Sequence, residues 1–246
     1  MTRVYDLPTR FFHWLFAGCF LIAFSIGNWV DDDSVLFSYH MIAGITLCLA
    51  LIWRLIWGVG GSKHARFSDF LLHPKALFSY LRHSVSGENQ RYAGHNPASS
   101  WAALVMMLLA ICLGITGLLM ITGPFDHAIE EIHEFCANAF MLTVVLHLLG
   151  IVLHTIKHKD PIGKSMLTGE KQNLPESLTS VPKHTVIAFV YLVFTLSCST
   201  ILLKNFDPDS RSTSLFGITL TLSEFEGADE NEHDESEEHN SHSKHE

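Results

Sequence analysis

The stretch FFHWLFAGCFLIAFSIGNWV, residues 11–30, decides the fold class because it carries no formal charge over 20 residues. An α-helix rises about 1.5 Å per residue, so this stretch would be about 30 Å long, the thickness of a bilayer's hydrocarbon core. It is too long for the apolar part of a signal peptide, and AFSIGNWVDDD at its end offers no convincing cleavage site. We therefore expect a permanent transmembrane helix, which contains one histidine, His13.

Four further uncharged runs of similar length follow along the chain, at 34–53, 101–122, 135–156 and 185–203. Spans that must satisfy every backbone polar group inside lipid form helices unless they close into a barrel. The sequence therefore predicts an all-α membrane protein. We expect a four-helix transmembrane bundle within residues 1–172, with helices at about 10–30, 34–57, 99–122 and 129–156. A linker and fifth transmembrane helix would occupy 173–206, and a disordered, acidic, His-rich tail 207–246, whose histidines are an alternative weak metal site.

The charged residues predict the orientation. Of the 16 Lys and Arg residues, 13 lie in segments 1–10, 54–100 and 157–184, and three follow the fifth run. Because positively charged loops stay in the cytoplasm, we expect a cytoplasmic N-terminus and a C-terminus on the opposite side. The net charge of −9 lies mostly on that opposite side, which argues against a nucleic-acid partner. Within 54–100, the spacing of Leu77, Leu81 and Val85 predicts a short helix on the membrane surface.

Four histidines within the expected transmembrane helices require an explanation: His13, His40, His133 and His147. A single intramembrane histidine can simply hydrogen-bond to a neighbouring helix. Here, however, the depths match, because His13 and His147 lie toward the cytoplasmic side and His40 and His133 toward the other. His133 and His147 are 14 residues apart, so they lie about 21 Å apart along the helix and within about 40° of one face.

Two imidazoles at each of two depths fit two haem groups, each with bis-His axial ligation. We predict that His13 pairs with His147 and that His40 pairs with His133. His154 remains an alternative to His147, because it lies two turns further along nearly the same face. Such haems transfer electrons, since both axial positions of the iron are filled.

Several motifs make the chain resemble the di-haem membrane cytochrome b family, which includes bacterial cytochrome b561 and the b-type subunits of nickel–iron hydrogenases and formate dehydrogenases. They are PTRFFHW (8–14), SYHMIAG (38–44), GHNP (94–97), the His133/His147 pair and KSMLTGEK (164–171). The resemblance covers roughly residues 4–172. It implies two non-covalent haem b groups and a place in the inner membrane of a bacterium. It also implies an electron-transfer subunit of a respiratory chain, rather than a stand-alone enzyme. The fifth helix and the tail lie outside the resemblance.

The resemblance also implies a quinone pool on one side and a redox protein on the other: a periplasmic cytochrome c, or a dehydrogenase or hydrogenase subunit. In GHNP, His95 could exchange a proton and Asn96 could hydrogen-bond a quinone carbonyl. Asn96 and Pro97 are equally typical of a helix start. Arg10 and Arg54 are candidates to pair with haem propionates, with Lys63 and Arg66 as weaker ones. Positive-inside topology explains these cations equally well.

Two other functions remain open. The chain could be a membrane anchor that docks a partner enzyme, or a transporter whose histidines relay protons. A proton relay does not need paired rings at two depths, which favours electron transfer. The five cysteines form no CxxC or CxxCH motif, and no hydrolytic or nucleotide-binding motif is visible.

Overall fold

The computed structural model describes residues 1–86, 92–122, 127–159, 161–172, 174–175 and 178–222. Among these residues, five helices are long and apolar enough to cross a membrane. They are α1 (Leu7–Trp29), α2 (Ser38–Gly60), α4 (Pro97–Thr122), α5 (His127–His158) and α7 (Thr185–Lys204). The prediction of an all-α membrane protein with five spans is confirmed, although α1 begins three residues before the expected start and α5 extends at both ends.

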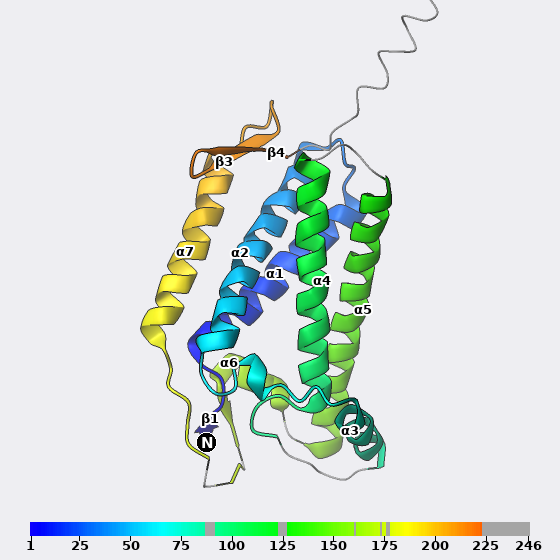
Figure 1. The fold of residues 1–246 in the computed structure, drawn as a ribbon, viewed down its shortest axis with the longest axis vertical. Coiled ribbons are helices and arrows are strands. Elements are labelled where there is room, and N and C mark those ends of the chain that lie inside the picture. The colour runs from blue at the N-terminus through cyan, green and yellow to red at the C-terminus, as the bar shows by residue number, and fades with distance from the viewer. Residues whose placement is uncertain (87–91, 123–126, 160, 173, 176–177, 223–246) are drawn as a thin grey trace, which may run out of the picture.

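The long helices run side by side (Figure 1). α1 packs along α2, α4 packs along α5, and α2 joins the two hairpins through its contact with α4. α7 packs on α1 and α2, on the side away from α5 (Figure 1). Local signals set the helix starts. Asp6 caps α1 by accepting a hydrogen bond from the Thr9 N–H at 2.9 Å, and Pro8 lies in the first turn.

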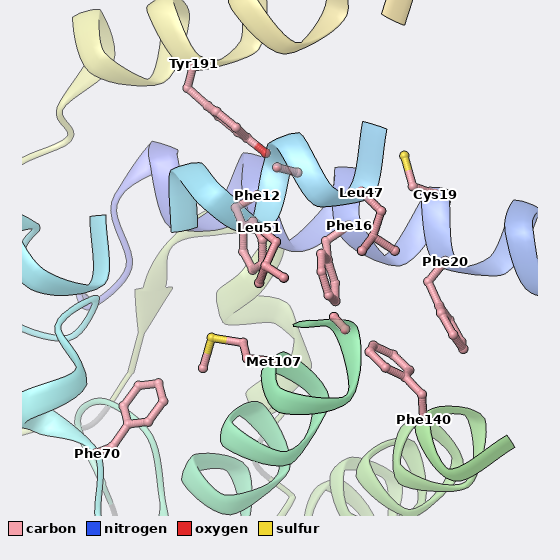
Figure 2. Packing of buried hydrophobic residues seen from close by; sticks show 12 residues of the cluster. Phe12, Phe16, Cys19, Phe20, Leu47, Leu51, Phe70, Met107, Phe140 and Tyr191 are labelled. Atoms are coloured by element: carbon pink, nitrogen blue, oxygen red, sulfur yellow. The ribbon is translucent and has the colours of Figure 1, made fainter. Parts of the chain in front are cut away.

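An aromatic layer fills the middle of the bundle. Phe20 of α1 stacks on Phe140 of α5 with ring centroids 4.0 Å apart, and Phe16 lies 5.8 Å from the same ring (Figure 2). Phe140 is 1% exposed, and it lies midway in sequence between His133 and His147. On the other side, Tyr191 of α7 stacks against Trp53 of α2. These rings bind the two hairpins and the fifth helix to one core.

The end of the bundle that holds the N-terminus, called the basic end here, is closed by short elements. They are β1 (Thr2–Arg3), η2 (Phe67–Asp69), α3 (Pro74–Ser86), η3 (Ile162–Lys164), α6 (Ser165–Thr168) and β2 (Glu170–Lys171). β1 pairs antiparallel with β2, so the N-terminus is fastened to the segment that follows α5. α3 is the predicted surface helix and packs against the start of α4 (Figure 1). Leu77 is partly buried there, but Leu81 is exposed.

The opposite end, called the acidic end, carries Asp31, Asp32 and Asp33, the 3₁₀ turn η1 (Val35–Phe37) and a hairpin of β3 (Ser212–Leu215) and β4 (Ile218–Thr221). Phe216 and Gly217 form the hairpin's two-residue turn with φ values of 52° and 83°. Leu222 is buried against Ile42 and Leu202, so the segment is fixed to the bundle.

The expectation of disorder from residue 207 onward therefore does not hold as far as residue 222. The hairpin forms because its backbone groups pair with each other and one apolar residue reaches the core. Residues 223–246, where the His-rich segment lies, are outside the described residues.

Candidate haem-binding site

At the acidic end, the structure brings His40 and His133 together, with ring centroids 6.1 Å apart. The Nδ1 atom of His40 lies 2.8 Å from the carbonyl oxygen of Ala23, so that nitrogen carries the hydrogen and donates it. The Nδ1 atom of His133 lies 2.8 Å from Thr116 Oγ1. Thr116 uses its single hydroxyl hydrogen on the Cys112 carbonyl at 2.9 Å. With its hydrogen directed to that carbonyl, as is usual for threonine within a helix, the Thr116 oxygen is the acceptor for His133 Nδ1–H.

Both rings thus share one tautomer, in which Nδ1 carries the hydrogen and Nε2 keeps a lone pair for a metal. Two bonds of about 2 Å from imidazole nitrogens to one metal ion would place the ring centres about 6 Å apart. The observed spacing of 6.1 Å fits that arrangement. The donor set therefore fits an axially ligated haem iron.

Glycines leave room for these rings. A Cβ atom added at Gly27 would lie 3.1 Å from His40 Nδ1, closer than most real contacts allow. A Cβ atom at Gly117 would lie 3.5 Å from His133 Cε1, in ordinary contact. The absence of a side chain at residue 27 therefore lets α1 approach α2 closely enough for Ala23 to accept the hydrogen bond from His40.

At the basic end, His13 of α1 and His147 of α5 line one cavity of about 470 Å³. Its volume lies within the range of about 300–1,000 Å³ that holds cofactor-sized ligands. Phe16, Phe20 and Phe140 form its floor in the middle of the bundle. His154 lines the same cavity, so both alternatives for the second ligand reach it.

The cavity wall carries buried positive charge. Arg54 is only 4% exposed, lies over the rings of Phe12 and Phe67, and has an Nη1 atom with no hydrogen-bond partner in the described part of the chain. Lys171 also lines the cavity, and its Nζ donates to the carbonyl oxygens of Tyr92 and Gly94. A buried guanidinium with an unused donor is costly unless an anion reaches it, which fits the carboxylates of a haem.

His95 and Asn96 also line this cavity. Burial, together with the positive charges of Arg54 and Lys171, lowers the pKa of His95 to about 3. The His95 ring is therefore neutral at physiological pH. Asn96 accepts a hydrogen bond from the Ser99 N–H at 2.8 Å, so it caps α4 as the helix-start alternative requires.

Arg10 is not among the residues that line the cavity. Its Nε donates to the carbonyl oxygen of Met166, so it supports the segment after α5. Lys63 and Arg66 are also absent from the lining. Sequence reasoning missed Lys171, although it ends the quoted KSMLTGEK motif, and it missed the buried pair of His64 and Asp69.

Comparisons with known proteins match one family and several relatives. The prokaryotic cytochrome b561 family matches residues 4–169. A probable Ni/Fe-hydrogenase B-type cytochrome subunit of Bradyrhizobium diazoefficiens is 21% identical over 210 residues, covering 69% of this chain and 85% of the relative. A probable subunit of the same name from Rhodobacter capsulatus is 26% identical over 220 residues, covering 68% and 80%.

A third probable Ni/Fe-hydrogenase B-type cytochrome subunit, from Azotobacter vinelandii, is 28% identical over 137 residues, covering 46% of this chain and 57% of the relative. No solved structure gives a significant match. The family match spans α1, α2, α4 and α5, which carry all four paired histidines, and it ends before α7. The chain therefore belongs to the prokaryotic cytochrome b561 family.

Proposed function

We propose that this b-type cytochrome carries electrons across the membrane through two haem b groups, one held by His40 and His133 and the other by His13 and His147. Each haem, when bound, supplies one-electron iron chemistry with both axial positions filled. The observation that supports the proposal is the close approach of the His40 and His133 rings, whose Nδ1 atoms are each engaged by a partner, Ala23 and Thr116, so that ligation would fall to the Nε2 atoms.

The protein's own residues would keep these groups in place. Ala23 and Thr116 orient the ligand rings at the acidic end, and hydrogen-bond partners of this kind are worth about 10–100-fold in metal affinity. Arg54 and Lys171 would neutralise carboxylates at the basic end. The apolar cavity wall would exclude water. For the basic-end ligand we favour His147 over His154, which lies only three residues from the end of the span at Lys157.

We further propose that electrons pass between a hydrogenase on the acidic side and a quinone on the basic side. The names of the relatives support the hydrogenase partner. In balanced form, H₂ gives two protons and two electrons at the partner, and a quinone takes two electrons and two protons to become a hydroquinone. His95 and Asn96 line the cavity where a quinone carbonyl could be bound.

A basic cytochrome c is the second candidate for the acidic side. The observation in its favour is the exposed run of Asp31, Asp32 and Asp33 beside the His40 end of α2. Adding H₂ to native membranes discriminates the two partners. Reduction of the b-type haem by H₂ supports the hydrogenase, whereas reduction only by added ferrocytochrome c supports the alternative.

The haem assignment has its own test. The purified full chain should show a reduced-minus-oxidised b-type spectrum with two haems per chain. His40→Ala should lose one haem, whereas His127→Ala, an exposed histidine on the same helix as His133, should keep both. A colourless preparation, or a His40→Ala variant with two unaltered low-spin haems, would overturn the proposal and favour a proton-relaying transporter.

A further inference from the structure

A polar pair that the electron path does not use lies beside the cavity at the basic end. His64 Nδ1 and Asp69 Oδ2 are 2.7 Å apart, within the segment between α2 and α3. His64 is 6% exposed, whereas the Asp69 side chain is 29% exposed. His64 is therefore buried among the short elements of the basic end, whereas its partner Asp69 reaches water.

Gly94 lies directly against this pair. A Cβ atom added at Gly94 would lie 2.6 Å from His64 Nδ1 and 3.2 Å from Asp69 Oδ2. Gly94 itself lines the cavity, and so does the next residue, His95. The Nδ1 atom of His95 is buried with no hydrogen-bond partner among the residues that the structure describes. A buried, unused ring nitrogen on the cavity wall is a place where a proton can be received or given.

We propose that His64 and Asp69 form the proton-exchange site that connects the basic-end cavity to water. The inference rests on the proposed quinone chemistry, because each quinone that gains two electrons must also gain two protons. The electrons arrive through the two haems, and the protons arrive from the aqueous side. His64 takes up a proton from water and passes it toward the cavity, and it regains a proton for the second transfer.

The roles follow from the hydrogen bond and the surrounding charges. Asp69 accepts from His64 Nδ1–H, fixes the tautomer, and stabilises the imidazolium that forms when the other ring nitrogen takes a proton. The Tyr5 ring, which lies under Lys171, packs edge-on against His95, and the charges of Arg54 and Lys171 disfavour the protonated form of His95. His95 is therefore the relay on the cavity side, and His64 with its carboxylate partner is the exchange site on the water side.

Stopped-flow oxidation of the reduced protein by a short-chain quinone tests this role. The full chain with both haems is reduced with dithionite, mixed with the quinone, and followed at the haem band in H₂O and D₂O. Asp69→Asn should slow haem oxidation about tenfold and enlarge the solvent isotope effect, because proton delivery becomes rate-limiting. Haem content and both midpoint potentials should stay at the wild-type values.

Three companion variants sharpen the result. His64→Gln should reproduce the slow phase, Asp69→Glu should restore most of the rate, and Asp209→Asn, an exposed position at the acidic end, should change nothing. Wild-type rates and isotope effects in both Asp69→Asn and His64→Gln would overturn the proton-exchange role while leaving the quinone reaction intact. A wild-type protein that no quinone oxidises would instead overturn the proposed function, and this role with it.

Discussion

A hydroxyl group has only one hydrogen, and this fact decides how His133 is held. Thr116 gives its hydrogen to the Cys112 carbonyl in its own helix, so its oxygen remains as the acceptor for His133 Nδ1–H. One side chain of α4 thus orients a ring on α5. The same outcome is reached for His40 with a backbone carbonyl, because Ala23 lies on α1 where that helix meets α2.

Thr116→Val removes the acceptor while keeping the shape of the side chain. We expect the haem at the acidic end to bind about 10–100-fold more weakly, because His133 loses the partner that fixes its ring. Titrating the apoprotein with haem measures the change. Thr122→Val is the control, because Thr122 lies on the same helix and its hydroxyl donates a hydrogen bond to the Leu118 carbonyl of its own turn. Equal affinities in the two variants would show that the Thr116 hydrogen bond does not support the ligand.

Gly27→Ala tests the close approach of α1 to His40. The added methyl would lie 3.1 Å from Nδ1 and 3.2 Å from Cε1, so the ring or the helix must shift. We expect the haem at the acidic end to be lost or its low-spin signal to change, and electron paramagnetic resonance spectra measure either result. Gly18→Ala on the same helix meets nothing within 4 Å and should keep two unaltered haems. An unchanged spectrum of Gly27→Ala would contradict the role of His40 as a haem ligand at the acidic end.

At the scale of elements, the aromatic layer separates the two histidine levels. Phe140 contacts Phe16 and Phe20 from the opposite hairpin, so α1 and α5 meet at mid-depth (Figure 2). His133 and His147 lie seven residues to either side of Phe140 on α5, so the layer falls between the two proposed sites.

Phe140→Ala should destabilise the protein by about 3–5 kcal/mol, the usual cost of removing a buried phenylalanine. For a chain of this size that corresponds to a fall of roughly 6–20 °C in Tm. Thermal unfolding in detergent, followed by loss of the haem band, measures it. Phe135→Ala is the matched control, because Phe135 lies on the same helix and is 71% exposed. A fall in Tm no larger than the control's would contradict a packed layer.

The long helices could be predicted from sequence because lipid imposes a length and a composition on each span. The pairing of His40 with His133 could be predicted too, since each lies near one end of its run. The choice between His147 and His154 could not, because a helix of 3.6 residues per turn returns both to one face, and both line the cavity.

The polar cluster at the basic end could not be predicted for a different reason. Its members come from three separate segments of the chain, and no spacing rule relates residues that meet only through tertiary structure. They are His64, Gly94 and Lys171. Five of residues 212–221 are Ser or Thr and an acidic, low-complexity segment follows them, so composition did not distinguish this hairpin from a disordered tail. Its buried anchors, Thr213 and Leu222, give no periodic signal.

At the scale of the whole molecule, charge separates the two ends. The acidic end carries the exposed run Asp31, Asp32 and Asp33. The basic end carries the Lys and Arg residues of β1, α3 and the segment after α5. Positive charge near spans holds a loop in the cytoplasm. This distribution supports a cytoplasmic N-terminus and a periplasmic hairpin.

Reporter fusions test that orientation. Alkaline phosphatase joined after Leu222 should be active, because that enzyme folds only outside the cytoplasm. The same reporter joined after Ser86, at the end of α3, should be inactive. The reverse pattern would invert the molecule and move the proposed quinone site to the other face of the membrane.

The pairing of β1 with β2 has a consequence for biosynthesis. Thr2 pairs with Lys171, and the Val181 N–H donates to the carbonyl of Arg3. The first residues to leave the ribosome must therefore wait for partners made some 170 residues later. Lys171, Gln172 and Leu174 line the basic-end cavity, so this part of its wall is complete only after the last of them has been synthesised.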